Sequence, residues 1–284
     1  MAVTTTPEPV LAPPAAPRRR RLPANLGTLV ILCVAAFLTL GPVVWTLFRA
    51  LTPQEAGEPR HFSLSAFSDV FDQIDMVQLV LNSALVTGLI VVGQMFVAGL
   101  AGYVFARVEF RGRGLLFGLV LATMMVPLQV TIVPVFMLIR GMGLADTLLS
   151  LILPAIPTAF GTFLMRQYFM TMPPELGEAA AIDGAGPFRT FWSVYLPLAA
   201  PGLAVVGILA FNYHWNEFFR PLIFSISEEN YTLPLGLVTL QGNLGTGSVA
   251  TVLAGVVLSM IPAVIVFIFG QRRLREGLTA GIGK

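Results

Sequence analysis

A short polar segment between two long apolar stretches holds the residues whose spacing most clearly suggests a function. Pro173-Pro174 favours a helix start and Gly184 supplies a left-handed stop, so the residues between them should form a short helix. Glu178 and Asp183 place charges at positions i and i+5, with small alanines between them that allow a partner to approach closely. Gly186-Pro187 then begins a second helix. These features predict a docking helix, with an ordinary interfacial helix as the alternative.

Polar side chains also lie within the apolar stretches, where they are costly and usually face a cavity or another helix. The candidates are Asn82, Gln94, Gln129 and Asn212, followed by Trp215, Asn216 and Glu217 near the end of one stretch. Amide groups and aromatic faces suit a sugar, so these side chains are candidates for the lining of a pathway. Two alternatives remain open, because amides also join neighbouring helices and Glu217 can pair with Arg220 at i, i+3.

Known catalytic and metal-binding patterns are missing from the sequence. It has no His-Glu-x-x-His motif, no Gly-x-Ser-Gly serine site, no pair of intramembrane aspartates and no phosphate-binding loop. His61 and His214 are the only histidines, are far apart, and have no Cys or acidic neighbours at ligand spacing. Cys33 is the single cysteine. We therefore expect no catalytic residue, no metal and no cofactor, and ATP hydrolysis would have to reside in another chain.

The composition is that of a membrane protein. Hydrophobic residues make up 56% of the chain and charged residues 11%, with a mean hydropathy of +0.81, whereas soluble domains carry roughly 25% charged residues. The basic residues cluster at the ends of apolar stretches, which favours a role in membrane topology over nucleic-acid binding.

Six apolar stretches reach the roughly 20 residues that are needed to cross the hydrocarbon core. They cover residues 27–48, 77–105, 115–138, 147–169, 197–223 and 249–270. We expect a disordered cytoplasmic tail over residues 1–22, a first transmembrane helix and external loop over 23–76, a core over 77–270 with a cytoplasmic loop at about 171–196, and a cytoplasmic tail over 271–284.

Orientation and helix shape follow from two further patterns. Lys and Arg are concentrated in the segments that share a side with the N-terminal arginines, which predicts that both termini and the Glu178 segment are cytoplasmic. Prolines within the stretches predict kinked helices, namely Pro127, Pro134, Pro154, Pro157 and Pro201.

The pattern from Glu178-Ala179-Ala180 through Gly184 to Leu196-Pro197 resembles the cytoplasmic coupling loop of permease subunits in binding-protein-dependent ABC importers. Other segments resemble the carbohydrate branch of these permeases, in particular the smaller subunit of maltose-type, multiple-sugar and glycerol-phosphate importers. These segments are Leu100–Arg107, Met125–Val130, Gly143–Thr147, Trp215–Phe218, Thr232–Leu237 and Glu276–Gly281.

The resemblance implies an all-α membrane protein with six transmembrane helices and the type I ABC importer permease fold, in a bacterial-type cytoplasmic membrane. It implies half of a translocation pathway for a sugar or related polyol. It also implies three kinds of partner: a second, different permease subunit, two ATP-binding subunits and an extracytoplasmic solute-binding protein. The residues that would couple the chain to the ATP-binding subunits are Glu178, Ala179, Ala180, Asp183 and Gly184.

Alternatives concern the cargo and the class of protein. An importer of the same class for glycerol-3-phosphate or another small solute is the nearest one. A membrane enzyme is disfavoured because its motifs are missing. A stand-alone secondary transporter is disfavoured because it would show internal repeats and intramembrane ionisable residues, of which the apolar stretches carry almost none.

Overall fold

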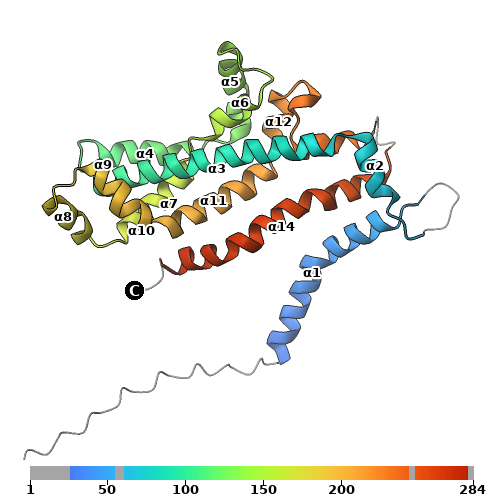
Figure 1. The fold of residues 1–284 in the computed structure, drawn as a ribbon, viewed down its shortest axis with the longest axis horizontal. Helices are drawn as coiled ribbons and strands as arrows, with labels where there is room; N and C mark the ends of the chain where they lie inside the picture. Colours follow the sequence, from blue (N-terminus) through green and yellow to red (C-terminus); the bar gives the residue numbers. More distant parts are fainter. Residues whose placement is uncertain (1–25, 55–60, 243–246, 281–284) are drawn as a thin grey trace, which may run out of the picture. The chain divides into compact units, whose positions relative to one another are not determined.

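The computed structural model describes residues 26–54, 61–242 and 247–280, and the regular elements in these ranges are all helices, without a strand (Figure 1). The tail predicted over residues 1–22 lies outside the described residues. The chain divides into two compact units, residues 1–45 and 46–284. The first unit contains most of helix α1 (Leu26–Leu51), which is long and apolar enough to cross a membrane.

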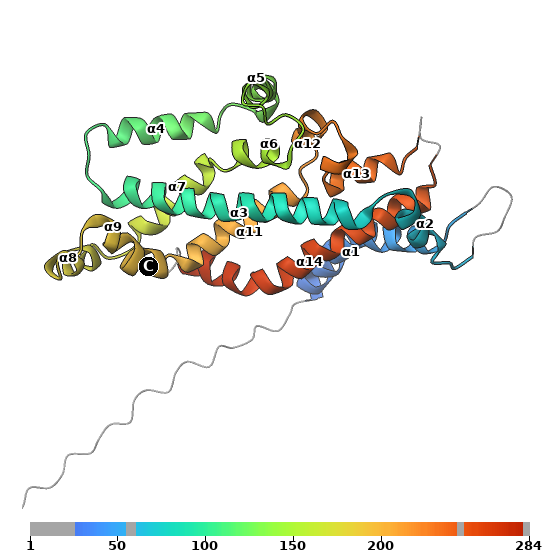
Figure 2. The ribbon, with the colours of Figure 1, turned by 45° about the horizontal axis from the view of Figure 1, so that its top comes forward.

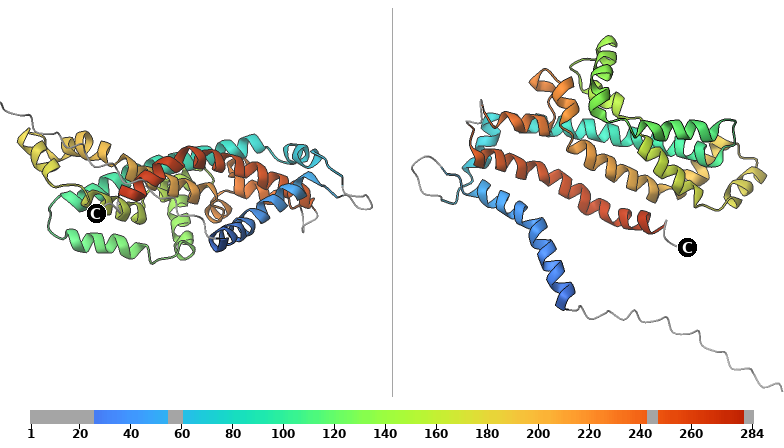
Figure 3. Two further views of the ribbon diagram at one scale, coloured as in Figure 1. Left: turned by 90° about the horizontal axis from the view of Figure 1, so that it is seen from below. Right: turned by 180° about the vertical axis from the view of Figure 1, so that it is seen from behind.

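Helix α3 (Met76–Arg107) is the helix of the second unit against which several of the other helices pack. Asp75 caps its start by accepting a hydrogen bond from the Gln78 backbone N–H at 3.0 Å. It packs along α7 (Ala159–Met170) and α11 (Ala200–Trp215). Helix α14 (Val249–Ala280, red) runs beside α11 and reaches α2 (Ser65–Gln73), as Figure 3 shows. The tail predicted to start at residue 271 therefore begins inside a helix.

Three further candidate spans are each broken into two helical parts (Figure 2). Helices α4 (Arg113–Thr123) and α5 (Leu128–Gly141) meet at 99°. Helix α6 (Leu148–Ile152) and the 3-10 turn η1 (Leu153–Ala155) meet α7 at 41°. A third pair meets at 74° and comprises α9 (Pro187–Thr190), the π-helical turn η2 (Phe191–Tyr195), α10 (Leu196–Leu198) and α11.

These breaks occur where prolines interrupt the helix. Pro127 and Pro157 lie in the first two breaks, and Pro201 is the second residue of the helix that follows the third. Counting each bent pair as one span, the described residues hold up to six spans, so the predicted all-helical membrane fold with kinked helices is confirmed.

One predicted span was wrong in its position. The apolar stretch 197–223 was read as one helix, but the bent pair runs from Pro187 to Trp215. The chain leaves the helix at Asn216, and residues Phe219–Phe224 form a separate helix, α12. The apolar residues after Glu217 were mistaken for a continuation because hydropathy alone does not register a turn at polar residues.

The remaining elements lie near the two ends of α3 (Figure 1). Helices α8 (Glu175–Ile182) and α9 lie near its C-terminal end. Helix α2 lies near its N-terminal end, where η3 (Glu228–Asn230) and α13 (Leu233–Thr239) also belong. All three hydrophobic clusters include residues of α3: Leu79 in the first, Ala98 and Tyr103 in the second, and Val86 and Ile90 in the third.

Gly102 marks the closest approach of α3 to α7. A Cβ atom at this position would lie 2.6 Å from the Met165 Cβ and 2.8 Å from the Arg166 backbone nitrogen. Ala98, one turn earlier, faces Gly161, whose own added Cβ would lie 3.1 Å from that of Ala98. Small residues at i and i+4 are the usual means by which helices pack closely in a membrane, where apolar lipid supplies no hydrophobic drive.

Gly102→Ala is expected to destabilise the protein by about 1–3 kcal/mol, because the backbone of α7 must move to admit the methyl group. Unfolding of the purified protein in detergent measures the effect. Gly88→Ala is the matched control, since Gly88 lies on the same helix and nothing stands within 4 Å of an added Cβ. Equal stability of the two variants would contradict the close contact.

Asp146 ties together two connections that are far apart in sequence. It lies between α5 and α6 with a positive φ of 56°. Its carboxylate accepts hydrogen bonds from the Ile226 and Ser227 backbone N–H groups at 2.8 and 3.0 Å and from the Ser227 hydroxyl at 2.5 Å. The Asn230 amide donates to the Asp146 backbone carbonyl at 2.8 Å. The hydrogen bonds from Ser227, first from its hydroxyl and then from its backbone, lower the pKa of Asp146 from 3.8 to about 2.

The stabilisation by Asp146 should depend on pH in a defined window. Its folded pKa lies below its unfolded pKa, so the contribution is complete above pH 3.8 and is lost as the pH falls towards 2. We expect Asp146→Ala to lower the unfolding temperature by a constant amount between pH 7 and pH 4 and by less at lower pH. Thermal unfolding of both proteins over this range tests this, and a difference that already shrinks between pH 7 and pH 5 would contradict it.

Candidate functional site

Helix α8 is a short, exposed helix with a defined end. It follows Pro173 and Pro174 and carries Glu175 and Glu178 in its first turn, where carboxylates favour the positive end of the helix dipole. Gly184 has a φ of +75°, and its N–H donates to the Ala181 carbonyl at 3.0 Å while that of Ala185 donates to Ala180 at 2.9 Å. This pair of bonds is the Schellman ending. The left-handed stop predicted at Gly184 is therefore present.

The predicted coupling residues lie on α8 and directly after its end, and all but one of them are exposed. Glu178, Ala179, Asp183 and Gly184 are exposed, whereas Ala180 is buried. Two apolar residues that the sequence reasoning missed, Ile182 and Phe188, are 86% and 70% exposed. Their signal was available, because both are large apolar residues within an otherwise polar segment. A hollow of about 450 Å³ in the same segment is lined by other residues, among them Leu176, Ala179, Asp183, Arg189 and Val194.

An aromatic cluster joins this segment to α3 and α7. The Tyr103 ring lies 5.1 Å from Phe191, 5.2 Å from Tyr195 and 5.9 Å from Phe169, measured between ring centroids. The Tyr103 hydroxyl also donates to the Pro187 carbonyl at 3.1 Å. Offset and edge-to-face aromatic contacts of this kind add to the energy of burial, so η2 is held firmly against both helices.

Arg107, at the C-terminal end of α3, adds a polar fastening. Its guanidinium donates to the carbonyl of Phe169 at 2.6 Å and to that of Met172. It also lies 5.3 Å from the centre of the Tyr195 ring. Gly177 of α8 lies against the Tyr195 hydroxyl, because a Cβ atom there would be 3.0 Å from it. These contacts join α8 to the ends of α3 and α7.

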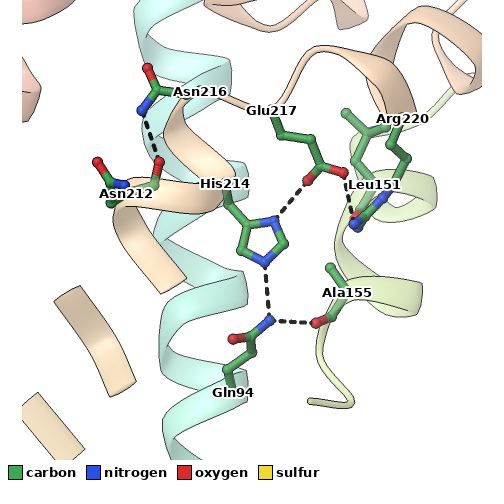
Figure 4. A network of polar contacts seen from close by, with 8 residues as sticks. All are labelled: Gln94, Leu151, Ala155, Asn212, His214, Asn216, Glu217 and Arg220. Atoms are coloured by element: carbon green, nitrogen blue, oxygen red, sulfur yellow. Dashed lines mark hydrogen bonds and ion pairs between the residues drawn. The ribbon is translucent and has the colours of Figure 1, made fainter. Parts of the chain in front are cut away.

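A second arrangement of interest is a buried polar network at the other end of α11 (Figure 4). His214 Nδ1 lies 2.8 Å from a Glu217 carboxylate oxygen, and the other oxygen lies 2.9 Å from Arg220 Nη2. His214 Nε2 lies 3.0 Å from the Gln94 amide nitrogen. The side chains of His214, Glu217 and Arg220 are all less than 10% exposed. The apolar surroundings strengthen each interaction and make an unpaired member costly.

This network bears on two expectations from the sequence, which concern His214 and the pairing of Glu217 with Arg220. The expectation from the sequence that His214 has no acidic neighbour at ligand spacing is wrong, because Glu217 at i+3 contacts it directly. The ion pair between Glu217 and Arg220, which the sequence left open as an alternative, is present. Within the described part of the chain no group of three or more His, Cys, Asp or Glu side chains is placed to hold a metal ion.

Four of the six predicted pathway residues come together around one hollow of about 450 Å³. They are Gln129, Asn212, Asn216 and Glu217. Gln129, Asn212 and Asn216 are exposed. A larger cavity of about 640 Å³ shares Asn212 and Tyr213 with this hollow and is also lined by Gln94, His214 and Arg220. Both volumes fall in the range of small-molecule sites.

The other two predicted pathway residues lie elsewhere. The Asn82 amide donates to the carbonyls of Glu229 and Tyr231 at 2.8 and 2.9 Å, and so fastens a connection to α3. Trp215 is 4% exposed, packs in the first hydrophobic cluster and donates to the Ser259 carbonyl at 3.2 Å. Their surroundings are those of residues that join helices.

Comparisons with known proteins agree with this architecture. Residues 77–276 match the family of binding-protein-dependent transport system inner membrane components. The chain is 39% identical over 200 residues to the arabinooligosaccharides transport system permease protein AraQ of Halalkalibacterium halodurans, covering 70% of this chain and 71% of that one. It is 36% identical over 201 residues to the sn-glycerol-3-phosphate transport system permease protein UgpE of Yersinia pestis bv. Antiqua, covering 70% and 72%.

A solved structure extends the likeness to the fold. A chain of a bacterial ABC transporter involved in the import of the acidic polysaccharide alginate is 26% identical, with a TM-score of 0.76 over 88% of this chain and 95% of that one. The matched region contains α8, the aromatic cluster and the polar network. The resemblance to the permeases of carbohydrate importers is thus confirmed, and the chain belongs to the family of binding-protein-dependent transport system inner membrane components.

Proposed function

We propose that this chain is one of two different permease subunits of an ATP-driven importer and that α8 couples it to an ATP-binding subunit. The observation that carries the proposal is the exposure of Ile182, at the end of α8, and of Phe188, in α9. Large apolar side chains that are this exposed outside the apolar stretches favour a protein interface. A short helix that seats these residues in a groove of a partner is a common recognition mode.

Contacts between the α8 segment and the membrane-spanning helices would carry a movement of α8 to these helices. The aromatic cluster and Arg107 fasten the segment to α3 and α7. These helices pack too closely at Gly102 to slide independently. A partner that displaces α8 would therefore turn the packed helices together as a rigid body, which is how closely packed domains change state.

The proposed cargo is a sugar or related polyol. The hollow beside Gln129, Asn212 and Asn216 offers amide groups that donate and accept hydrogen bonds, and Tyr213 adds an aromatic ring. The named cargoes of the relatives, arabinooligosaccharides and alginate, are carbohydrates. Glycerol-3-phosphate or another small solute is the alternative, favoured by the likeness to UgpE.

The family description supports one further partner and a location in the inner membrane. A binding-protein-dependent system implies an extracytoplasmic solute-binding protein. The chain would then bring no catalytic residue of its own, and two ATP-binding subunits would hydrolyse ATP. We propose that both termini and α8 face the cytoplasm, on the basis of the Lys and Arg distribution.

Purification of the tagged chain from mild-detergent membranes tests the assembly. We expect a second permease, an ATP-binding subunit and a solute-binding protein to accompany it, identified by mass spectrometry. Recovery of the chain alone, under conditions that keep other ABC importers intact, would count against the proposal.

Substitutions in α8 test the coupling. Glu178→Lys or Gly184→Val should lower uptake by the reconstituted importer about tenfold, within the usual range of coupling between sites. ATP hydrolysis should then no longer respond to the loaded binding protein. Gly184→Val strains a left-handed backbone position that glycine tolerates.

Matched controls lie in the connection between α3 and α4. Gly112→Val introduces the same strain, because Gly112 has a φ of +83° and open space around it. Glu109→Lys makes the same charge reversal at an exposed position. Both controls should keep normal uptake. Normal uptake by the α8 variants as well would overturn the assignment of α8.

A further inference from the structure

The span formed by α6, η1 and α7 is interrupted, and the break leaves polar backbone groups to be satisfied within an apolar region. Its first part ends at Ala155, its second begins at Ala159, and Pro157 lies between them. In a continuous helix the Ala155 carbonyl would accept from the N–H of residue 159. At a helix end the carbonyl needs another donor, since an unpaired one costs several kcal/mol in hydrocarbon.

Side chains from other helices donate hydrogen bonds to one backbone carbonyl in α6 and to one at the end of η1. Gln94 of α3 donates its amide hydrogen to the Ala155 carbonyl at 2.8 Å. Arg220 of α12 donates to the Leu151 carbonyl at 2.8 Å. Glu217 and His214 connect these two donors, so an unbroken chain of polar contacts runs from Leu151 to Ala155 across the end of the first part (Figure 4).

Hydrogen-bond geometry determines which atom donates and which accepts in the contacts of Gln94 and His214. Gln94 must point its amide nitrogen at Ala155, because its oxygen would face another acceptor there. The second hydrogen of that nitrogen then points to His214 Nε2, which must accept it. With Nε2 as the acceptor, Nδ1 is the ring nitrogen that donates to Glu217.

We propose that Gln94 and His214 are positioning residues of the transport step and hold the α6–α7 span at its bend. The importance of the bend for transport rests on the function proposed above, whereas the bend itself can be measured without it. Pro154, Pro157, Thr158 and Phe160 of this span line the 640 Å³ cavity. The bend therefore sets the shape of that cavity, and the network sets the bend.

The distance between the two ends of the span reports the bend. In a background in which Cys33 is replaced by Ser, spin labels are attached to cysteines introduced at Leu149 and Met170, whose side chains are 48% and 53% exposed. Pulsed electron-spin measurements on the full chain in lipid nanodiscs then give the distribution of label distances. Size-exclusion profiles and thermal unfolding verify that each variant is folded.

Gln94→Leu should shift and broaden the distance distribution, because the Ala155 carbonyl loses its donor. Asn82→Leu is the matched control: it also removes an amide of α3 that donates to two groups, but those groups are the Glu229 and Tyr231 carbonyls, which do not belong to the broken span. It should keep the original distribution. If Gln94→Leu fails to fold, Gln94→Asn shortens the same amide by one methylene and replaces it.

Two substitutions of His214 separate its two contacts. His214→Gln keeps an acceptor near the position of Nε2 and should preserve the distribution. His214→Asn keeps a donor near the position of Nδ1 but loses the acceptor for Gln94, and it should behave like Gln94→Leu. A residue that only fills space would not distinguish these two amides.

Uptake by the assembled importer completes the test. Gln94→Leu and His214→Asn should lower the maximal rate about tenfold, the effect of one buried hydrogen bond on an equilibrium, while His214→Gln stays near the original rate. Original distances in Gln94→Leu, or equal distances in the two His214 variants, would overturn the inference. If the distances follow the expectation but no importer assembles, the positioning of the bend stands and the proposed function fails.

Discussion

The close approach of α3 to α7 is the contact on which the rest of the second unit depends. At Gly102 the two helices come so near that an added methyl group would meet backbone atoms of α7. In lipid, where burying apolar surface gains little, dispersion contacts between closely packed atoms must hold the helices together. Residues of α3 also belong to all three hydrophobic clusters. The helices that pack in these clusters are therefore positioned relative to α3.

The two functional regions use different physical means at opposite ends of α11. Near η2 the packing is aromatic, with rings of Tyr103, Phe191 and Tyr195 in contact and Arg107 fastening the edge. Near α12 the contacts are polar and buried, where each hydrogen bond restricts direction as well as distance. The aromatic rings hold their helices together by close packing, whereas the hydrogen bonds of the polar network also restrict how the groups are oriented.

Local features of this protein could be predicted from the sequence, whereas features that join distant segments could not. The end of α8 was predictable because a glycine in the left-handed region stops a helix by itself. The helical membrane fold followed from the apolar stretches. The contact of Gln94 with His214 and Ala155 joins residues that are 120 and 61 positions apart, and no periodicity encodes it. The polar turn after Trp215 was missed because hydropathy averages over it.

The two pathway candidates that lie elsewhere illustrate the same limit. Asn82 and Asn212 are both asparagines within apolar stretches, yet Asn82 fastens a connection and Asn212 lines a hollow. Residue type indicated that each side chain would need polar surroundings. Only the packing of other segments decides whether these surroundings are a carbonyl group or open space.

The spacing of Glu217 and Arg220 also bears on how the chain enters the bilayer. The two opposite charges stand three residues apart and contact each other directly, so they emerge from the ribosome almost together. They can neutralise each other as soon as both have been synthesised, so that the segment enters the bilayer as an ion pair and not as two separate charges. Gln94 and the end of α6 were synthesised earlier and are already present when this pair forms. The order of synthesis thus allows the most polar part of the interior to assemble without a costly unpaired intermediate.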